Sequence, residues 1–380
     1  MTEKRDLIVK LTSELVSIPS ESKNQKEVLA ALDLVSSYLD GLGLKVVDFE
    51  KNGVFSRLWI NETNEGGPVR ILLSGHIDVV DADEDQFVSR LEDGKIFGRG
   101  SGDMKGHDVA MMVSLRSYIE KGGDGSVGLL LTGDEEVGGF NGARFVLEQG
   151  LRAELVFVPD GTYDFDIVES QKAPHHFHVR ASGVGGHASR AFEIENPVNR
   201  LLNVYSEMRK KYSVATKDND WHSTFELTVI KTGANSENSI PSDVDAWFSW
   251  RWPLEDFSFE EGIADFTKLC EDNECTIVTE TNKREGEKIS HGMGEGCLTD
   301  RDDDQVVLWK KTIEEVLKKE VGFLNMHGAT DGRHFYKYGS KVLATSAVSG
   351  SHHAKNGEWV DVESLEILSI AIEKYLELVA

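Results

Sequence analysis

Residues 69–78 read Val-Arg-Ile-Leu-Leu-Ser-Gly-His-Ile-Asp, a β-type run that ends in an imidazole and a carboxylate. The same arrangement returns three times further along the chain. Residues 127–136 run from Val-Gly-Leu-Leu-Leu-Thr into Gly-Asp-Glu-Glu, residues 155–161 run from Leu-Val-Phe-Val into Pro-Asp-Gly, and the run 341–347 is followed shortly by two adjacent histidines. Short apolar runs bounded by turn residues predict buried strands.

Segments with helical spacing of apolar residues alternate with these strands. The pattern predicts two helices near the N-terminus and further helices over residues 105–121, 142–149 and 305–319. Strands that alternate with helices predict an α/β fold with a mostly parallel, twisted sheet and helices on both faces. We expect this sheet to form from two separate parts of the chain.

The middle of the chain has a different pattern of predicted strands and helices. Strand-like runs over 176–181, 225–231 and 245–251 accompany a helix over 197–212, which has a proline in its first turn. We therefore expect residues 173–288 to form an α+β domain inserted into the α/β domain. The α/β domain would consist of residues 1–172 and 289–380.

Composition excludes several classes of partner. The formal net charge is −25, which argues against nucleic acid because phosphate binding needs a basic surface. The N-terminus resembles an amphipathic helix more than a signal peptide, and no apolar run approaches the ~20 residues that span a bilayer. Three cysteines without a CxxC pair are too few for a disulfide framework and predict buried or bystander thiols. We expect a cytoplasmic protein with no membrane partner.

The polar residues after the strands predict a metal site. In open α/β sheets, functional loops lie beyond the carboxyl ends of the strands. A glycine-rich loop over 98–106 adds Asp103 just before a helix. One acid or histidine at such a loop is ordinarily a turn or capping residue, but five at one sheet edge form a set. Two histidines with three carboxylates suit two zinc-class ions that share one carboxylate.

Other hydrolytic and nucleotide-binding signatures do not occur in the chain. There is no GxSxG segment for a serine hydrolase, no HExxH for a single-zinc protease and no GxxxxGK[ST] phosphate loop. No cysteine is placed near a plausible histidine partner.

Three segments give a resemblance to a known family. They are Gly75 to Val80 (GHIDVV), Gly98 to Gly106 (GRGSGDMKG) and Asp134 to Gly138 (DEEVG). In their order and spacing they resemble the signature of a family of dizinc hydrolases. The family includes bacterial glutamate carboxypeptidase, acetylornithine deacetylase, succinyl-diaminopimelate desuccinylase, aminoacylase-1 and several dipeptidases. Further matching segments extend the resemblance along the chain: 185–189 (GGHAS), 238–241 (NSIP), 331–333 (DGR) and 358–360 (EWV).

The resemblance implies a role for each matching residue. His76 and Asp160 would hold one zinc, Glu136 and His353 the other, and Asp103 would bridge both. Asp78 would orient the His76 ring through its far nitrogen. Glu135 would be the general base that takes a proton from water and passes it to the leaving amine. Cobalt or manganese could replace zinc.

Two positions depart from the family pattern. Many relatives have Glu where this chain has Asp160, and Asp is more familiar in dipeptidase-like members. The last metal ligand could be His352 or His353. We prefer His353 because Glu358 then follows five residues later, as in glutamate carboxypeptidase-like members.

In the inserted domain, the resemblance implies a homodimer in which His187 reaches the partner's active site. A histidine that only completes a turn is the alternative. Asn238, Arg251 and Arg333 match positions that bind a substrate carboxylate, which suits the planar fork of arginine. For Arg251, an ion pair within its own strand stays open.

These observations predict a dizinc hydrolase that cleaves an amide or peptide bond in a small substrate with a free carboxylate. Asp160 favours a dipeptidase- or carboxypeptidase-like metallopeptidase. An N-acyl-amino-acid deacylase, of the deacetylase or desuccinylase type, is the alternative. A catalytically inactive metal-binding relative is a remote one, because Glu135 and every expected ligand are present.

Overall fold

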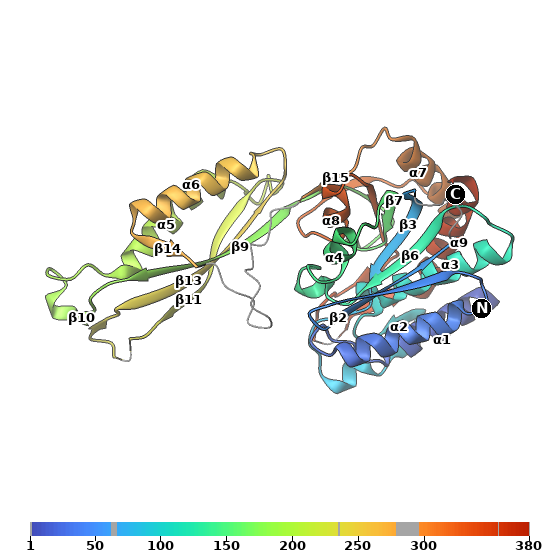
Figure 1. Cartoon of the computed structure of the whole chain (residues 1–380), viewed down its shortest axis with the longest axis horizontal. Coiled ribbons are helices and arrows are strands. Elements are labelled where there is room, and N and C mark those ends of the chain that lie inside the picture. Colours follow the sequence, from blue (N-terminus) through green and yellow to red (C-terminus); the bar gives the residue numbers. More distant parts are fainter. Residues whose placement is uncertain (1, 62–66, 235, 279–295, 356, 380) are drawn as a thin grey trace. The chain divides into compact units, whose positions relative to one another are not determined.

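The computed structural model describes residues 2–61, 67–234, 236–278, 296–355 and 357–379. The chain forms two compact units (Figure 1). The discontinuous unit contains residues up to 170 and from 297 onward, and the inserted unit spans residues 171–296. The expected domain boundary between residues 288 and 289 lies outside the described residues.

A mixed sheet forms the centre of the discontinuous unit. In the described part of the chain its strand order is β1-β2-β6-β3-β7-β17-β8-β15, with β16 paired to β8. The central neighbours β6, β3, β7 and β17 are parallel, whereas β1, β2 and β8 join antiparallel. The strand bounds are β1 Lys45–Lys51, β2 Val54–Ile60, β3 Val69–His76, β6 Val127–Thr132, β7 Ala153–Val158, β8 Ile167–Gln171, β15 Cys297–Leu298, β16 Phe323–Met326 and β17 Lys341–Ala344.

Helices cover both faces of this sheet, as the sequence predicts. Side chains alternate along a strand, so Ile71 and Leu73 of β3 face one core cluster and Leu72 faces the other. Helices on the Ile71 side are α1 (Glu3–Val16), α2 (Gln25–Leu39), α3 (Gly106–Glu120), α7 (Asp304–Leu317) and α9 (Val362–Val379). The Leu72 side carries α4 (Ala143–Glu148) and α8 (Gly332–Lys337). The predicted α/β fold is confirmed.

Local chemistry explains where the helices begin. In α1, the Thr2 side chain accepts a hydrogen bond from the Arg5 amide at 3.1 Å, and buried Ile8, Leu11 and Leu15 recur at helical spacing. The α7 helix starts in the same way, because the Asp303 carboxylate accepts from the Gln305 amide at 2.9 Å.

A second, small antiparallel sheet lies in the discontinuous unit. Its strand order is β18-β19-β5-β4, with bounds Ser349–Gly350, Trp359–Asp361, Lys95–Phe97 and Arg90–Glu92. The sheet joins residues 90–97 to residues 349–361, which are distant in the sequence. The glycine-rich loop and the histidine pair therefore leave from the same small sheet.

The inserted unit is an antiparallel sheet with two helices. Its strand order is β11-β13-β9-β14, with bounds Thr224–Thr232, Asp243–Trp252, Ala173–Ser182 and Cys275–Ile277. The helices α5 (Pro197–Tyr212) and α6 (Phe259–Asp272) share one aromatic-rich core with one face of the sheet. A two-stranded ribbon, β10 (Gly186–His187) with β12 (Ser239–Ile240), completes the unit.

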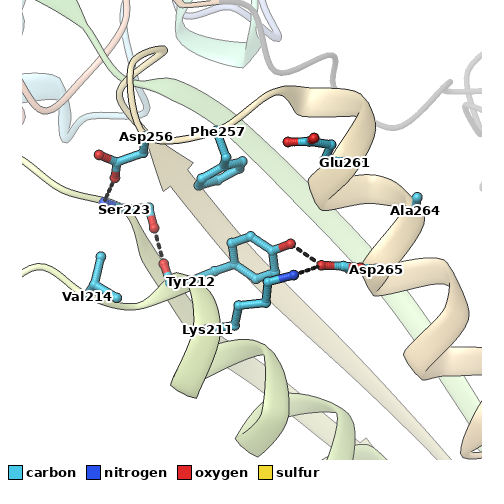
Figure 2. A pocket seen from close by; sticks show the side chains of 9 residues that line it. All are labelled: Lys211, Tyr212, Val214, Ser223, Asp256, Phe257, Glu261, Ala264 and Asp265. Carbon is cyan, nitrogen blue, oxygen red and sulfur yellow. Dashed lines mark hydrogen bonds and ion pairs between the residues drawn. The ribbon is translucent and has the colours of Figure 1, made fainter.

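The inserted unit has a surface cavity of about 640 Å³ between the end of α5 and α6 (Figure 2). Lys211 and Tyr212 both donate to the Asp265 carboxylate. The Asp256 carboxylate accepts from the Ser223 amide at 2.8 Å. These contacts compensate both acids within the fold, so we assign the cavity no chemistry.

Candidate metal centre

The central parallel strands bring the expected site residues to one edge of the sheet. His76 is the last residue of β3, Glu135 and Glu136 follow β6, and Asp160 follows β7. Because β3 lies between β6 and β7, the three loops leave the sheet side by side. Asp103 comes from the turn η2 (Ser101–Lys105) that leads into α3.

The ligand atoms of His76, Asp103 and Glu136 all lie within 4.8 Å of one another. The Nε2 atom of His76 is 3.1 Å from Asp103 Oδ1. The Nε2 atom of His353 is 3.1 Å from Asp103 Oδ2 and 3.1 Å from Glu136 Oε2. The two oxygens of Asp103 therefore face two different histidines.

Two further carboxylates face the same space. The nearest oxygens of Glu135 and Asp160 each lie 4.0 Å from His76 Nε2. The structure thus brings together all five residues expected to bind metal, together with the expected base.

Burial and crowding set the protonation of these groups. Burial raises the pKa of Asp160 to about 7, and repulsion from Asp103 adds to the shift. Burial likewise raises the pKa of Glu135 well above its usual value. For Asp103, burial acts in the same direction, but hydrogen bonds from His353 and His76 outweigh it and hold its pKa well below the usual value.

This donor set fits two divalent cations. Four carboxylates (Asp103, Glu135, Glu136 and Asp160) and two imidazoles meet in one partly buried space. Burying like charges is costly unless cations compensate them. Two divalent cations carry the charge that four ionised carboxylates require, and mixed imidazole and carboxylate ligands suit zinc-class ions.

Asp78 is fully buried and serves more than the His76 ring. The His76 Nδ1 atom is 3.0 Å from the Asp78 main-chain oxygen and 3.6 Å from its carboxylate, so the carbonyl is the nearer partner. The carboxylate accepts from the amides of Glu135 at 3.1 Å and Glu136 at 3.3 Å, and from the Ser22 hydroxyl at 2.6 Å. Asp78 therefore holds the loop that carries both glutamates.

Sequence analysis assigns no role in the site to Glu358 or Arg99, although both lie in quoted segments. The Glu358 carboxylate accepts from the amides of Gly102 and Asp103, each at 3.1 Å, and pairs with Arg99 at 2.5 Å. Both side chains are almost fully buried. Glu358 thereby fixes the backbone that presents the Asp103 carboxylate.

The two adjacent histidines occupy different positions. His353 contacts both Asp103 and Glu136, whereas His352 places its Nδ1 3.7 Å from Asp103 and its Nε2 2.8 Å from the Ser349 hydroxyl. His353 has a φ of +58°, in the left-handed region that non-glycine residues rarely adopt. Such backbone conformations concentrate at functional sites. The geometry favours His353 as the ligand.

Arg333 lies in the discontinuous unit, beside the glutamate loop. It is largely buried, and one guanidinium nitrogen donates to the Gly138 carbonyl at 2.8 Å. Its positive charge lowers the pKa of Glu135, although burial outweighs this contribution. Arg333 therefore lies near the expected base.

The remaining expected residues belong to the inserted unit. His187 is exposed and lies opposite Ser239 in the β10–β12 ribbon, and the Ala188 amide donates to the Asn238 carbonyl at 2.8 Å. His187 and Asn238 are therefore neighbours. Arg251 lies near the other end of β13, eight residues beyond Asp243, or about 26 Å along an extended strand. One chain does not bring Asn238 and Arg251 together.

Fold and site together define a class: an α/β protein whose central parallel strands end in a partly buried cluster of side chains suited to metal ions. The family model described as Peptidase family M20/M25/M40 matches residues 72–378. The chain belongs to this family, so it is a metallopeptidase-family hydrolase of peptide or amide bonds. The resemblance inferred from the sequence is confirmed.

Individual relatives are distant but match along almost the whole chain. The succinyl-diaminopimelate desuccinylase of Thioalkalivibrio sulfidiphilus is 26% identical over 88% of this chain and 90% of its own length. A Staphylococcus aureus tripeptidase structure matches with a TM-score of 0.77 at 18% identity, over 99% of this chain and 98% of that chain. The structure of a dinuclear metal-binding peptidase from Bacillus subtilis matches with a TM-score of 0.66 at 14% identity, over 99% of this chain and 98% of that chain.

Among the described residues, no helix is long and apolar enough to cross a membrane.

Proposed function

We propose that His76, Asp103, Glu136, Asp160 and His353 bind two zinc ions, with Asp103 between them. The observation that carries this proposal is the geometry of Asp103, whose two oxygens each lie 3.1 Å from a different histidine. Asp160 lies on the His76 side of this carboxylate and Glu136 on the His353 side. In this proposal His76 and Asp160 form one set of ligands, Glu136 and His353 form the other, and Asp103 belongs to both.

Two such cations, when bound, polarise a carbonyl group and lower the pKa of water towards ~7. Glu135 is the proposed general base. Its carboxylate faces the same space as the ligands, 4.0 Å from His76 Nε2, and Asp78 fixes its backbone amide. It takes one proton from the attacking water and returns it to the leaving nitrogen.

The proposed substrate is a small peptide with a free carboxylate, cleaved in a dipeptidase- or carboxypeptidase-like reaction. Arg333 is the proposed carboxylate-binding residue of the discontinuous unit, because it lies near Glu135 and uses one nitrogen on Gly138. The aspartate at position 160 supports the peptidase assignment by resemblance. The second candidate, an N-acyl-amino-acid deacylase, is supported by the 26% identity to a desuccinylase.

The inserted unit is proposed to form a homodimer in the cytoplasm and to supply His187 to the partner's site. An exposed histidine beside Asn238, on a ribbon at one end of the unit, supports this role. The separation of Asn238 from Arg251 is also consistent with a carboxylate site completed by two chains. Mixing inactive His187→Ala chains with inactive Glu135→Gln chains should restore activity. No recovery after demonstrated subunit exchange would contradict the arrangement.

Metal content and substrate screening test the central proposal. Reconstituted protein should contain two zinc ions per chain by elemental analysis, and Asp103→Ala should lose both because each depends on the bridge. The same enzyme is then assayed on a panel of dipeptides and N-acyl amino acids with zinc, cobalt or manganese. Full activity at one tightly bound ion would contradict the bridged centre. Turnover of only the acylated substrates would select the deacylase alternative.

A further inference from the structure

An exposed aromatic ring lies beside the metal centre. Tyr163 follows Asp160 by three residues, and 61% of its surface is exposed. The loop that carries it is hydrogen-bonded to the segment that follows β17. The Thr162 amide donates to the Ser346 hydroxyl at 3.1 Å, and that hydroxyl donates to the Thr162 carbonyl at 2.8 Å. The Ser349 amide also contacts the Tyr163 carbonyl at 3.4 Å. The backbone is therefore held while the ring stays exposed.

The ring packs on His352, with 4.7 Å between the ring centroids. His352 is itself held between two polar partners, since its Nε2 lies 2.8 Å from the Ser349 hydroxyl and its Nδ1 lies 3.7 Å from Asp103 Oδ2. One side chain thus separates Tyr163 from the proposed bridging carboxylate. This packing also gives His352 a role that differs from that of the neighbouring ligand.

An apolar side chain borders the same loop from another direction. A β-carbon added to Gly161 would lie 2.5 Å from the sulfur of Met326, so Met326 packs directly against the residue that follows Asp160. Met326 is only partly buried. Single exposed apolar side chains are ordinary on protein surfaces. Here, exposed Tyr163 and partly buried Met326 both border the loop that follows Asp160, and Tyr163 also packs on the ring of His352.

We propose that Tyr163, supported by His352, is a specificity-determining residue that receives a bulky apolar group next to the scissile bond. The group is a leucine- or phenylalanine-like side chain, or an acyl chain of similar size. Aromatic faces bind such groups by removing apolar surface from water. The inference rests on the proposed hydrolytic function and adds the substrate class to it.

The test compares substrates that differ only in size at one position. Rates are measured on Gly-Gly, Gly-Leu, Leu-Gly, Gly-Phe and Phe-Gly, and on the matching N-acetyl amino acids. The wild-type enzyme should prefer the bulky residue at one of the two positions. Tyr163→Ala should lower this preference in kcat/KM about tenfold, the usual effect of losing one or two methylene-sized contacts. Tyr163→Phe should retain the preference because the ring remains.

A second readout does not require turnover. In the Glu135→Gln background, calorimetric titration should show weaker binding of the preferred Phe dipeptide when Tyr163 is replaced by alanine, with little change for Gly-Gly. Metal content should be unchanged. Leu378→Ala is the matched control, because Leu378 is 55% exposed but lies on α9.

Two results would overturn the inference: an unchanged preference in Tyr163→Ala, or an equal loss on glycine and bulky substrates. The second result would show that the ring only supports the loop. If the wild-type enzyme hydrolysed no dipeptide and no acyl amino acid, the proposed function would fail first, and the inference with it.

Discussion

Replacing Glu358 by alanine is expected to destabilise the discontinuous unit by about 3–5 kcal/mol, the usual cost of breaking a buried ion pair. The structure supplies the reasons. Glu358 and Arg99 have side-chain exposures of 1% and 2%, so the change leaves a buried guanidinium without its carboxylate. The amides of Gly102 and Asp103 lose their acceptor at the same time. Zinc affinity should fall as well, because these amides orient the proposed bridging ligand.

Hydrogen exchange of peptides from β3 and α3 is the assay, because it reports on this unit separately from the inserted one. The control is Asp81→Asn, which breaks the pair between Asp81 and Lys23 at 2.8 Å. Those side chains are 74% and 53% exposed, so this loss should stay below about 1 kcal/mol. The double variant Glu358→Leu with Arg99→Met should recover part of the stability, since no unpaired charge remains. A loss below about 1 kcal/mol in Glu358→Ala would refute the reasoning.

Three further predictions concern the centre itself. Glu135→Gln should keep both metals and lower kcat by ~10²–10⁴ or more, whereas Glu136→Gln should weaken one metal; metal loss that followed Glu135 would reverse the two roles. His353→Ala should reduce metal affinity more than His352→Ala in a competition titration with a chelator, and the opposite ranking would move the ligand by one residue. Burial raises the pKa of Asp134 to about 8, so the folded chain retains a proton there that the unfolded chain releases near pH 4. Stability of metal-free protein should therefore fall by up to about 1.4 kcal/mol per pH unit between these values, and a denaturation series should show that Asp134→Asn removes this contribution.

The parallel core of the fold could be predicted because its strands are long and apolar. Apolar runs such as Val69 to Ser74 and Val127 to Thr132 are typical of strands buried in a parallel sheet. The carboxyl ends of these strands then define the site. The small sheet could not be found in this way. Its strands have two or three residues, too few to show an alternation, and the pairing of β19 with β5 joins residues more than 250 positions apart.

The proposed metal-binding residues were easier to predict than the residues that hold them in place. His76, Asp103 and Glu136 stand in segments with a recognisable order, and the structure places their ligand atoms within 4.8 Å of one another. Glu358 supports Asp103 from 255 residues away, which no local pattern encodes. The position of Arg251 shows that closeness in sequence can also mislead. Thirteen residues separate it from Asn238 in sequence, yet an extended strand carries the two far apart.

The place where the inserted unit joins the sheet bears on how such a protein diversifies. The chain leaves the discontinuous unit after β8 and returns at β15, and these two strands are neighbours in the sheet. An insertion whose ends meet at adjacent strands can lengthen, shrink or change its surface without shifting the strands on either side. His76, Asp103, Glu136, Asp160 and His353 all lie outside it. The metal centre and those parts of the insertion that carry no proposed site residue can therefore change independently of each other during evolution.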